Sequence, residues 1–434
     1  MRKSRSVRNS LAAVVVAGVL AASTVLSAGA AQAKPSVLGP DFLWGVASSG
    51  FQSEGSSPDS NWLRYSRHQP DQIGTSVDFF HRYKSDIALA KGLGVKVYRI
   101  SVEWARIQPK PGVFDPAGVK FYDDVIAEIV AAGMRPMITL DHWVYPGWAA
   151  DRGGWSNPQM GAWWLASARY VVDRYAHDNP LWITINEVTA YMLQETRNGG
   201  LAPANVPMAL NQIVHVHRTI YDYIHARQPK AMVSSNVAYI PTIEPALDTQ
   251  FLDRVSDKLD FIGIDYYYQV SAQDLSAANL VLNNYGAAGV APDGIYYTLR
   301  HYGQKFPGKA LYIVENGMGT NNGEPRPDGV KRADLLRDDV YWMQRAKADG
   351  YNVIGYNYWS LTDNYEWGSY TPRFGLYTVN VKTDPSLRRI PTDAVAAYQQ
   401  ITAANGVGSA YRPTRPAQFC SLTDGVDSCV NPVH

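Results

Sequence analysis

Eight short runs rich in Val, Ile, Tyr and Trp recur along the chain, separated by longer stretches with an amphipathic pattern. Strands that alternate with helices pair in parallel, because each crossover returns the chain to the same end of the sheet. Eight such units over roughly 400 residues fit a β/α barrel with insertions. The predicted strands are Phe42–Ala47, Val95–Val102, Arg135–Leu140, Leu181–Asn186, Ala231–Ala238, Asp260–Tyr267, Leu311–Glu315 and Val353–Leu361.

The intervening stretches have helical periodicity. The clearest are Ser76–Lys91 and Pro116–Ala132, and each is followed by a glycine, Gly92 or Gly133, of the kind that commonly closes a helix. An open, doubly wound sheet is the alternative, but no Gly-rich phosphate-binding turn follows the first predicted strand. The sequence therefore predicts an α/β fold, a (β/α)8 TIM barrel in a single domain.

The first 33 residues have the pattern of a secretory signal peptide: a basic start, a short apolar run from Leu11 to Leu26, and the small residues around Ala33. A membrane anchor is the alternative, but this run is short and contains Gly18. We expect cleavage near Ala33, a secreted protein without a membrane segment, a barrel over residues 34–405 and an irregular tail over 406–434.

The net charge of the chain limits which binding partners are expected. Residues 1–33 carry four positive charges and no negative one, so their removal changes the formal net charge from +1 to −3. A slightly acidic protein does not attract phosphate backbones, and nucleic acid is not expected as a partner.

Cys420 and Cys429 are the only cysteines, and in an oxidising compartment we expect them to form one disulfide in the tail. A metal site or redox pair is the less favoured alternative.

Two predicted strands end in a carboxylate, Glu187 after Asn186 and Glu315 after Val314. Active sites of β/α barrels form at the carboxyl ends of the strands. Taken alone, each glutamate is equally well explained as one half of a structural ion pair. Together they suit the hydrolysis of an acetal, in which one carboxyl is protonated and the other ionised, about 5 Å apart when configuration is retained. Arg99 and Tyr267, at the ends of other predicted strands, would hold Glu315 ionised.

Aromatic and polar side chains gather near the same predicted strand ends. Aromatic rings stack on the C–H faces of sugars, and polar groups meet their hydroxyls, although a single Trp or His is often part of a core. The aromatic candidates are Trp143, Trp155, Trp359 and Trp367, and the polar ones are Gln52, His142, Asn186 and Glu366.

Several segments together resemble glycoside hydrolase family one, the β-glucosidase family. The resemblance runs from about Leu38 to about Gln400, with the motifs in family order. The matching segments are Phe42-Leu43-Trp44-Gly45, Gln52-Ser53-Glu54-Gly55, Tyr98-Arg99-Ile100-Ser101 with Trp104 and Arg106, His142-Trp143 with Pro146 and Gly153-Gly154-Trp155, Thr184-Ile185-Asn186-Glu187, Val314-Glu315-Asn316-Gly317, Trp359 to Trp367, and Arg373-Phe374-Gly375-Leu376.

The resemblance implies a secreted retaining β-glycosidase that needs no cofactor or metal and acts on a small β-glycoside or oligosaccharide. It implies Glu187 as acid/base and Glu315 as nucleophile, with Tyr267 and Arg99 contacting the nucleophile. Asn186 would meet the 2-hydroxyl and Trp359 would form the stacking floor. The other residues implied to bind the non-reducing sugar are Gln52, His142, Trp143, Glu366 and Trp367.

Three positions depart from the family pattern. Val188 replaces the usual Pro after the acid/base, and Val144 replaces an acidic residue after the His-Trp pair. Asp265 replaces an Asn before the paired tyrosines, which adds a carboxyl close to Glu315. An ionised Asp265 would oppose the charge of Glu315, so we expect Asp265 to be paired or protonated.

Three rival functions are less favoured. A phospho-β-glycosidase would meet repulsion between Glu366 and a phosphate. A binding protein without turnover would be expected to lack one of the two glutamates. A metal hydrolase would have to use His215 and His217, but positions two apart on a helix point to different sides. The sequence does not separate glucose from galactose or fucose, or water from an alcohol as acceptor, and predicts no oligomeric state.

Overall fold

The computed structural model describes residues 38–239, 244–268, 284–417, 428 and 433. Its main sheet has the strand order β5-β4-β3-β2-β1-β10-β8-β7-β6, and every neighbouring pair in it is parallel. The strands are β1 (Leu43–Ala47), β2 (Val97–Ser101), β3 (Arg135–Thr139), β4 (Leu181–Ile183), β5 (Met232–Ser234), β6 (Val237–Ala238), β7 (Phe261–Asp265), β8 (Ala310–Asn316) and β10 (Val353–Trp359).

The sheet closes because its two edge strands are consecutive in the chain. Only Ser235 and Asn236 separate β5 from β6, so these strands are two halves of one interrupted barrel strand. All eight predicted strand regions are thus present, and the prediction of a (β/α)8 barrel is confirmed. The main correction is that the run Ala231–Ala238 is broken in its middle rather than continuous, and some strands are shorter than predicted, as β4 is, which ends at Ile183 rather than Asn186.

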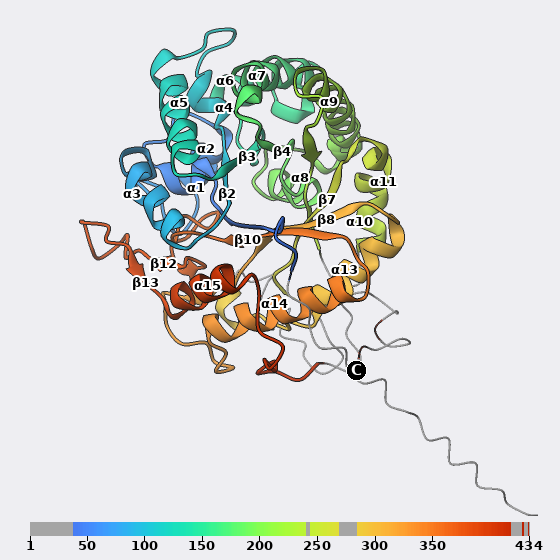
Figure 1. Cartoon of the computed structure of the whole chain (residues 1–434). Coiled ribbons are helices and arrows are strands. Elements are labelled where there is room, and N and C mark those ends of the chain that lie inside the picture. Colours follow the sequence, from blue (N-terminus) through green and yellow to red (C-terminus); the bar gives the residue numbers. More distant parts are fainter. Residues whose placement is uncertain (1–37, 240–243, 269–283, 418–427, 429–432, 434) are drawn as a thin grey trace, which may run out of the picture. The chain divides into compact units, whose positions relative to one another are not determined.

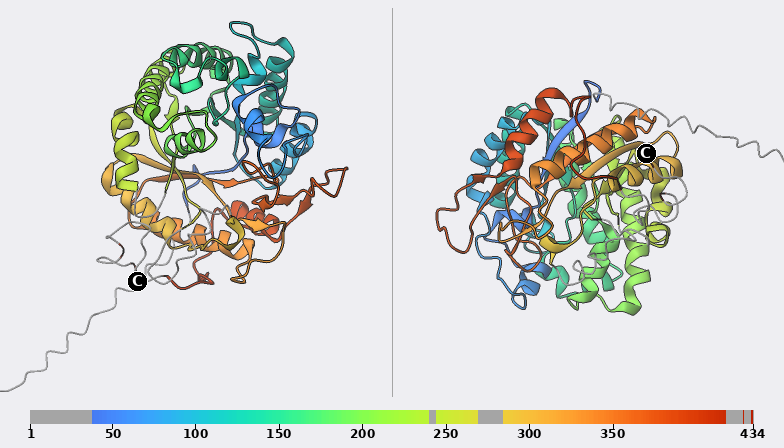
Figure 2. Two further views of the ribbon diagram at one scale, coloured as in Figure 1. Left: turned by 180° about the vertical axis from the view of Figure 1, so that it is seen from behind. Right: turned by 90° about the horizontal axis from the view of Figure 1, so that it is seen from below.

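Helices lie outside the strands, as Figure 1 shows for α5, α7, α9, α14 and α15. Figure 2 gives the same arrangement from behind and from below, with α14 and α15 in contact. The helices are α1 (Gly50–Glu54), α2 (Asn61–Ser66), α3 (Phe79–Gly92), α4 (Trp104–Ile107), α5 (Pro116–Ala131), α6 (Gly147–Ala150), α7 (Met160–Tyr175), α8 (Val188–Arg197), α9 (Val206–Arg227), α10 (Glu244–Gln250), α11 (Leu252–Val255), α13 (Gly294–Lys305), α14 (Arg332–Ala348) and α15 (Asp393–Ala404).

Local sequence explains where the predicted helices begin and end. Asp115 caps α5 by accepting a hydrogen bond from the Gly118 amide at 2.8 Å, and Gly133 follows in the left-handed region with φ +83°. The prediction for Gly92 is wrong, since Gly92 is the last residue of α3. The left-handed conformation occurs two residues later, at Gly94, with φ +75°.

The barrel interior is filled by its own apolar cluster, which is separate from the larger core between strands and helices. Its buried members are Val97, Met137, Leu181, Ile183, Phe261, Tyr312 and Val314. Gly45 on β1 lies so close to Asn357 that an added Cβ would be 2.1 Å from its Oδ1, which leaves room only for glycine at this point. The packed interior closes the amino-terminal part of the barrel and leaves the carboxyl ends of the strands for a site.

Short strands complete the described fold: β9 (Thr320–Asn321) pairs with β11 (Pro372–Arg373), and β12 (Tyr377–Thr378) with β13 (Ile390–Pro391). Of the helices in the described part of the chain, none combines the length and apolarity needed to cross a bilayer. The predicted signal peptide over residues 1–33 and the predicted disulfide between Cys420 and Cys429 lie outside the described residues.

Candidate active site

A pocket opens at the carboxyl ends of the strands, with a cavity volume of about 260 Å³. It brings together side chains from six of the eight strand ends or the loops that follow them. The lining residues are Gln52, His142, Trp143, Asn186, Glu187, Ala190, Gln194, Tyr267, Tyr268, Tyr285, Glu315, Trp359, Glu366, Trp367 and Phe374. Both glutamates predicted from the sequence therefore face one cavity.

Glu315 occupies the end of β8 and is 4% exposed. The guanidinium of Arg99 donates to its Oε1, and the Tyr267 hydroxyl donates to its Oε2 at 2.8 Å. A buried carboxylate with a cation on one oxygen and a hydroxyl donor on the other is stabilised in its ionised form. The structure thus brings Arg99 and Tyr267 to Glu315, as predicted from their positions in the sequence.

The loop after Glu315 packs directly against the next strand. At Gly317, an added Cβ would be 2.0 Å from the carbonyl oxygen of Trp359. Any side chain there would push the end of β8 away from β10. Gly317 therefore sets how closely the end of β8, which carries Glu315, approaches Trp359 at the end of β10.

Glu187 follows β4 and immediately precedes α8, in a left-handed backbone conformation with φ +39°. This conformation is uncommon for a residue with a side chain, and such residues concentrate at functional sites. Burial and the negative charge of Glu315 raise the pKa of Glu187 to about 8, against the opposing effect of Arg99. At neutral pH Glu187 therefore carries a proton while Glu315 makes the contacts of an anion.

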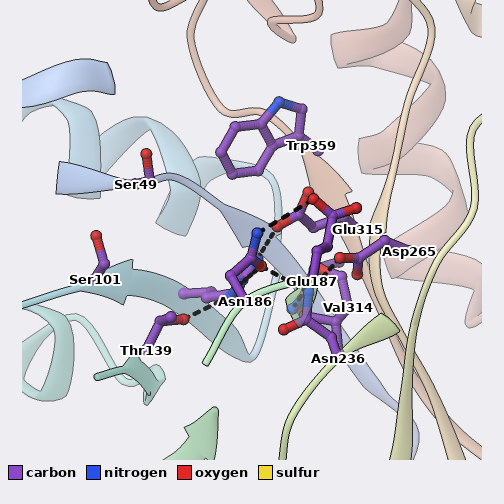
Figure 3. A network of polar contacts seen from close by, with 12 residues as sticks. Ser49, Ser101, Thr139, Asn186, Glu187, Asn236, Asp265, Val314, Glu315 and Trp359 are labelled. Atoms are coloured by element: carbon purple, nitrogen blue, oxygen red, sulfur yellow. Dashed lines mark hydrogen bonds and ion pairs between the residues drawn. The ribbon is translucent and has the colours of Figure 1, made fainter. Parts of the chain in front are cut away.

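Two asparagines connect these acidic groups. Asn186 accepts from Arg99 at 2.6 Å and from Asn236 at 2.7 Å through its Oδ1, and its Nδ2 lies 3.4 Å from Glu187. Figure 3 shows Asn186 and Asn236 beside Glu187, Glu315 and Asp265. Asn236 lies in the interruption between β5 and β6, which frees its side chain from the regular strand pattern.

On the opposite wall, Glu366 receives hydrogen bonds on both oxygens. The Trp359 indole donates to one at 3.2 Å and Gln52 donates to the other at 3.3 Å. Burial raises the pKa of Glu366 to about 8, despite these donors. The carboxyl group and the Gln52 amide form a forked polar surface suited to two neighbouring hydroxyls.

Aromatic rings enclose the remaining side of the pocket. His142 stacks between Trp359 and Trp367, with ring centroids 5.8 Å apart in both cases. Trp143 stacks on Trp367 at 4.6 Å, and both tryptophans have positive φ, +71° and +45°. Burial lowers the pKa of His142 well below its usual value, so the ring is neutral. Its Nδ1 has no hydrogen-bond partner among the described residues, which leaves it for a ligand hydroxyl.

Every residue predicted for the site, except one, lies in or directly behind this pocket. Trp155 is the exception: it is fully buried and its indole donates to Tyr191 at 2.9 Å, so it belongs to the core. Sequence reasoning missed Ala190, Gln194, Tyr268, Tyr285 and Phe374 among the lining residues. Phe374 stands inside one of the matching segments, and Tyr268 directly follows Tyr267, so both had a sequence signal.

The two valine departures are accommodated by packing. Val188 begins α8 and is 1% exposed, and Val144 is 4% exposed in the main core. Polar contacts hold the third-strand loop without an acidic residue at 144. Asn61 donates to the Trp143 carbonyl at 2.9 Å and accepts from the Tyr145 amide at 3.0 Å, and Asp141 accepts from the Trp143 amide at 2.9 Å.

His215 and His217, the two histidines that a metal hydrolase would have to use, do not line the pocket. His217 on α9 is buried, and its two ring nitrogens contact Thr184 at 2.7 Å and the Lys258 carbonyl at 2.9 Å. Burial lowers its pKa to about 4. His215, on the same helix, is exposed. Both nitrogens of His217 are thus used in packing the helix against the barrel.

A second cavity, of about 350 Å³, lies beside β9, β11 and the start of α14. It is lined by Met318, Thr320, Gly323, Glu324, Pro325, Arg326, Gly329, Val330, Lys331, Arg332, Arg373, Thr378, Thr392 and Asp393. None of the candidate catalytic or sugar-binding residues predicted from the sequence lines it, and the paired glutamates distinguish the smaller pocket as the candidate active site.

Comparison with known proteins gives a consistent result. The family model described as glycosyl hydrolase family 1 matches residues 35–237 and 226–407. Beta-glucosidase A of Thermotoga maritima is 26% identical over 444 residues, covering 84% of this chain and 98% of its own. Thermostable beta-glucosidase B of Thermobispora bispora is 27% identical over 441 residues, covering 85% and 91%.

Solved structures show the same fold. A beta-glucosidase from Thermotoga maritima in complex with deoxynojirimycin superposes with a TM-score of 0.74 at 24% identity. The superposition covers 86% of this chain and 100% of that one. The chain therefore has the fold of these solved structures.

Proposed function

The chain belongs to glycosyl hydrolase family 1 and is a retaining, β-glucosidase-like O-glycosyl hydrolase, and on this premise we propose which bond it cleaves and which residues do so. The substrate is a β-glycoside or β-linked oligosaccharide, from which the non-reducing terminal sugar is released by double displacement. The observation that carries the proposal is the pairing of Glu187 and Glu315 in one pocket, with the cation and the hydroxyl donor on Glu315.

In the first step, an oxygen of Glu315 attacks the anomeric carbon while Glu187 transfers its proton to the departing glycosidic oxygen. This forms a bond between Glu315 and the sugar and breaks the bond to the leaving group. The contacts with Arg99 and Tyr267 place a cation and a hydroxyl donor on Glu315 and fix its direction.

In the second step, Glu187 acts as a base. It removes a proton from a water molecule, whose oxygen attacks the anomeric carbon and displaces the Glu315 carboxylate. Once Glu315 is esterified it no longer carries the negative charge that raises the pKa of Glu187, so Glu187 becomes easier to ionise. The same pair therefore supports the change of role between the two steps.

The other pocket residues hold the sugar. Gln52 and Glu366 present the forked polar surface to its hydroxyls, and Asn186 lies beside Glu187, where it can meet the 2-hydroxyl. Trp359 provides a ring on which the sugar face stacks. His142, Trp143 and Trp367 complete this binding surface.

Azide rescue tests both assignments, because it replaces the missing carboxylate by a small nucleophile. Glu187→Ala with an activated aryl β-glycoside should form the glycosyl-enzyme, which azide then opens to give the β-glycosyl azide. Glu315→Gly should be inactive on natural glycosides and, with azide in the place of the carboxylate, should give the α-glycosyl azide. Full hydrolysis by the Glu315 variant, or the opposite anomers, would overturn the assignment. A panel of aryl β-glycosides identifies the preferred sugar.

We also propose that the protein is secreted after cleavage near Ala33. The support is the sequence of residues 1–33, with its basic start, apolar run and small residues before Lys34. The mature protein recovered from the medium of the producing cells should begin at Lys34 on amino-terminal sequencing. Recovery of the protein only with the cells, with Met1 intact, would contradict secretion.

A further inference from the structure

Asp265 adds a third carboxyl group to the two that the mechanism uses. It is the last residue of β7, it is 1% exposed, and its backbone is in register with Glu315 on the neighbouring strand β8. The groups around it with charge or a titratable proton are Glu315 on β8, Glu187 after β4, Arg99 on β2 and, further along its own strand, Tyr267. Arg99 is the only cation among them.

The contacts of Asp265 differ between its two oxygens. Asn236 donates one Nδ2 hydrogen to Asp265 Oδ2 and the other to Asn186 at 2.7 Å. Asp265 Oδ1 is buried and receives no N–H or O–H donor from the described residues. The carboxyl groups of Asp265 and Glu187 influence each other's pKa at close range, and Figure 3 shows the two residues in one network with Asn236.

A hydrogen bond between two carboxyl groups requires a proton on one of them. Arg99 already makes its carboxylate contact with Glu315, and among the described residues no second cation contacts Asp265 to hold it ionised. Because Asn236 donates to Oδ2, a proton on Asp265 would reside on Oδ1, the oxygen that otherwise has no donor or acceptor. Burial and the charges of Glu315 and Glu187 raise the pKa of Asp265 well above its usual value, in agreement with this placement.

We propose that Asp265 is a neutral carboxylic acid that donates a hydrogen bond from Oδ1 to Glu187, and that it acts as a positioning residue which makes Glu187 a stronger proton donor. The proposal rests on the proposed role of Glu187 as acid/base.

The effect on the reaction follows from the change in charge of Glu187. When Glu187 gives its proton to the departing oxygen, the hydrogen bond from Asp265 becomes a bond to an anion, which is roughly twice as strong as one between neutral groups. The bond therefore stabilises the product side of the proton transfer. It should matter most for glycosides with poor leaving groups, for which protonation is needed, and least for activated aryl glycosides.

Asp265→Asn is the first test. An amide has the same shape and still donates to Glu187 while accepting from Asn236, so the alkaline limb of the kcat/KM profile should stay within about 0.5 pH unit of wild type. If Asp265 were ionised, the substitution would remove a negative charge beside Glu187 and lower that limb by about 1 pH unit or more. A fall of that size overturns the proposal. Asp260→Asn, just before the opposite end of β7, is the matched control.

Asp265→Val is the second test, because it fills the space without a donor. The midpoint of the alkaline limb of the kcat/KM profile should move to higher pH by about 1 to 2 units. This is the size expected for loss of one hydrogen bond to a charged group. The rate with alkyl β-glycosides should fall by about tenfold or more, and the rate with dinitrophenyl glycosides by much less. An unchanged profile in a folded Asp265→Val protein would show that Asp265 has no such role.

Infrared difference spectra separate this proposal from the proposed function. At neutral pH, wild type minus Asp265→Asn should show one protonated carboxyl band, whatever the role of Glu187 in the reaction. Absence of that band would overturn a neutral Asp265, even if azide rescue supports Glu187 as acid/base. Presence of the band with failed azide rescue would instead refute the acid/base assignment alone.

Discussion

Among the described residues, two of the clusters of buried carboxyl groups beyond the carboxyl ends of the barrel strands can be compared directly, and only one of these two faces the pocket. The catalytic cluster combines Glu187, Glu315 and Asp265 with the single cation Arg99. The second, which we call the Arg106 cluster, combines Glu54 and Glu103 with Arg106 and Tyr122.

The Arg106 cluster is satisfied by its own members. Arg106 donates to Glu54 at 2.7 Å and to the Gly55 carbonyl at 2.9 Å, and Tyr122 donates to Glu54 at 2.7 Å. Glu103 accepts from Ser101 at 2.8 Å. None of these residues lines the pocket, although Gln52 does so from the same helix, α1, that carries Glu54.

The pKa values do not distinguish the two clusters. Burial and the charge of Glu54 raise the pKa of Glu103 to about 8, the same value that burial and Glu315 give Glu187. What differs is access, since Glu187 and Glu315 face a cavity and Glu103 is enclosed. A perturbed carboxyl is therefore evidence for catalysis only when a substrate can reach it.

The largest expected effect breaks the catalytic cluster. Glu315→Gln should reduce kcat on natural glycosides by about 10⁵-fold, because the covalent route is lost, as for other nucleophile knockouts. The matched change in the Arg106 cluster, Glu54→Gln, should leave kcat within about threefold, because Glu54 does not face the pocket. Initial rates of both purified variants give the comparison. A large loss of kcat in a folded Glu54→Gln protein would remove the distinction between the clusters.

The second prediction concerns stability. Arg106→Met leaves Glu54 buried without its cation and should lower the free energy of unfolding by about 3–5 kcal/mol. Arg174→Met removes a guanidinium from an exposed pair with Asp123 and should change it by only about 0–1 kcal/mol. Denaturant unfolding measures both. Equal effects would mean that Arg106 contributes no more than a surface charge.

The eight strands and the two glutamates that face the pocket could be predicted from the sequence, because a buried strand and the residue that ends it are local patterns. The interruption between β5 and β6, and with it the role of Asn236, could not, since it depends on how β7 pairs with that strand. Trp155 was misassigned for a related reason: its partner, Tyr191, is brought to it by α8.

The same limit applies to the acidic residues of the matching motifs. Glu54 and Glu315 both stand in segments that resemble the family, and nothing in the neighbouring residues says which of them faces a cavity. The difference arises from long-range contacts. Arg106 and Tyr122 enclose Glu54, whereas Arg99 and Tyr267 hold Glu315 from behind and leave it facing the pocket.

The third prediction uses the shared value of about 8 for the pKa of Glu103 and Glu187. A folded protein that keeps a proton which the unfolded chain has released is stabilised at low pH and loses that stability as pH rises. For Glu103 the loss extends from about pH 4.3, its value in an unfolded chain, to about pH 8. Glu103→Gln should therefore lose several kcal/mol less stability than wild type over this interval.

The free energy of unfolding of both proteins, measured at a series of pH values, gives this difference. Catalytic rates measured over the same pH range test Glu187. Activity should fall as pH rises through about 8, because Glu187 must be protonated in the first step. That limb should be the same in wild type and in Glu103→Gln. If the alkaline limb shifted in Glu103→Gln, the titration that controls activity would belong to the Arg106 cluster and not to Glu187.

The smallest expected effect compares two tyrosines that each donate to a carboxylate. Tyr267→Phe removes the 2.8 Å hydrogen bond to Glu315 and should lower kcat/KM by about tenfold, with little change in stability, since its hydroxyl reaches the pocket. Tyr122→Phe removes the 2.7 Å bond to Glu54 and should lower the free energy of unfolding by about 1–3 kcal/mol with an unchanged rate. Rates and denaturant midpoints of both variants should show effects of opposite kind. If both changed only stability, the contact between Tyr267 and Glu315 would be structural, because a hydroxyl that orients the nucleophile must affect the rate.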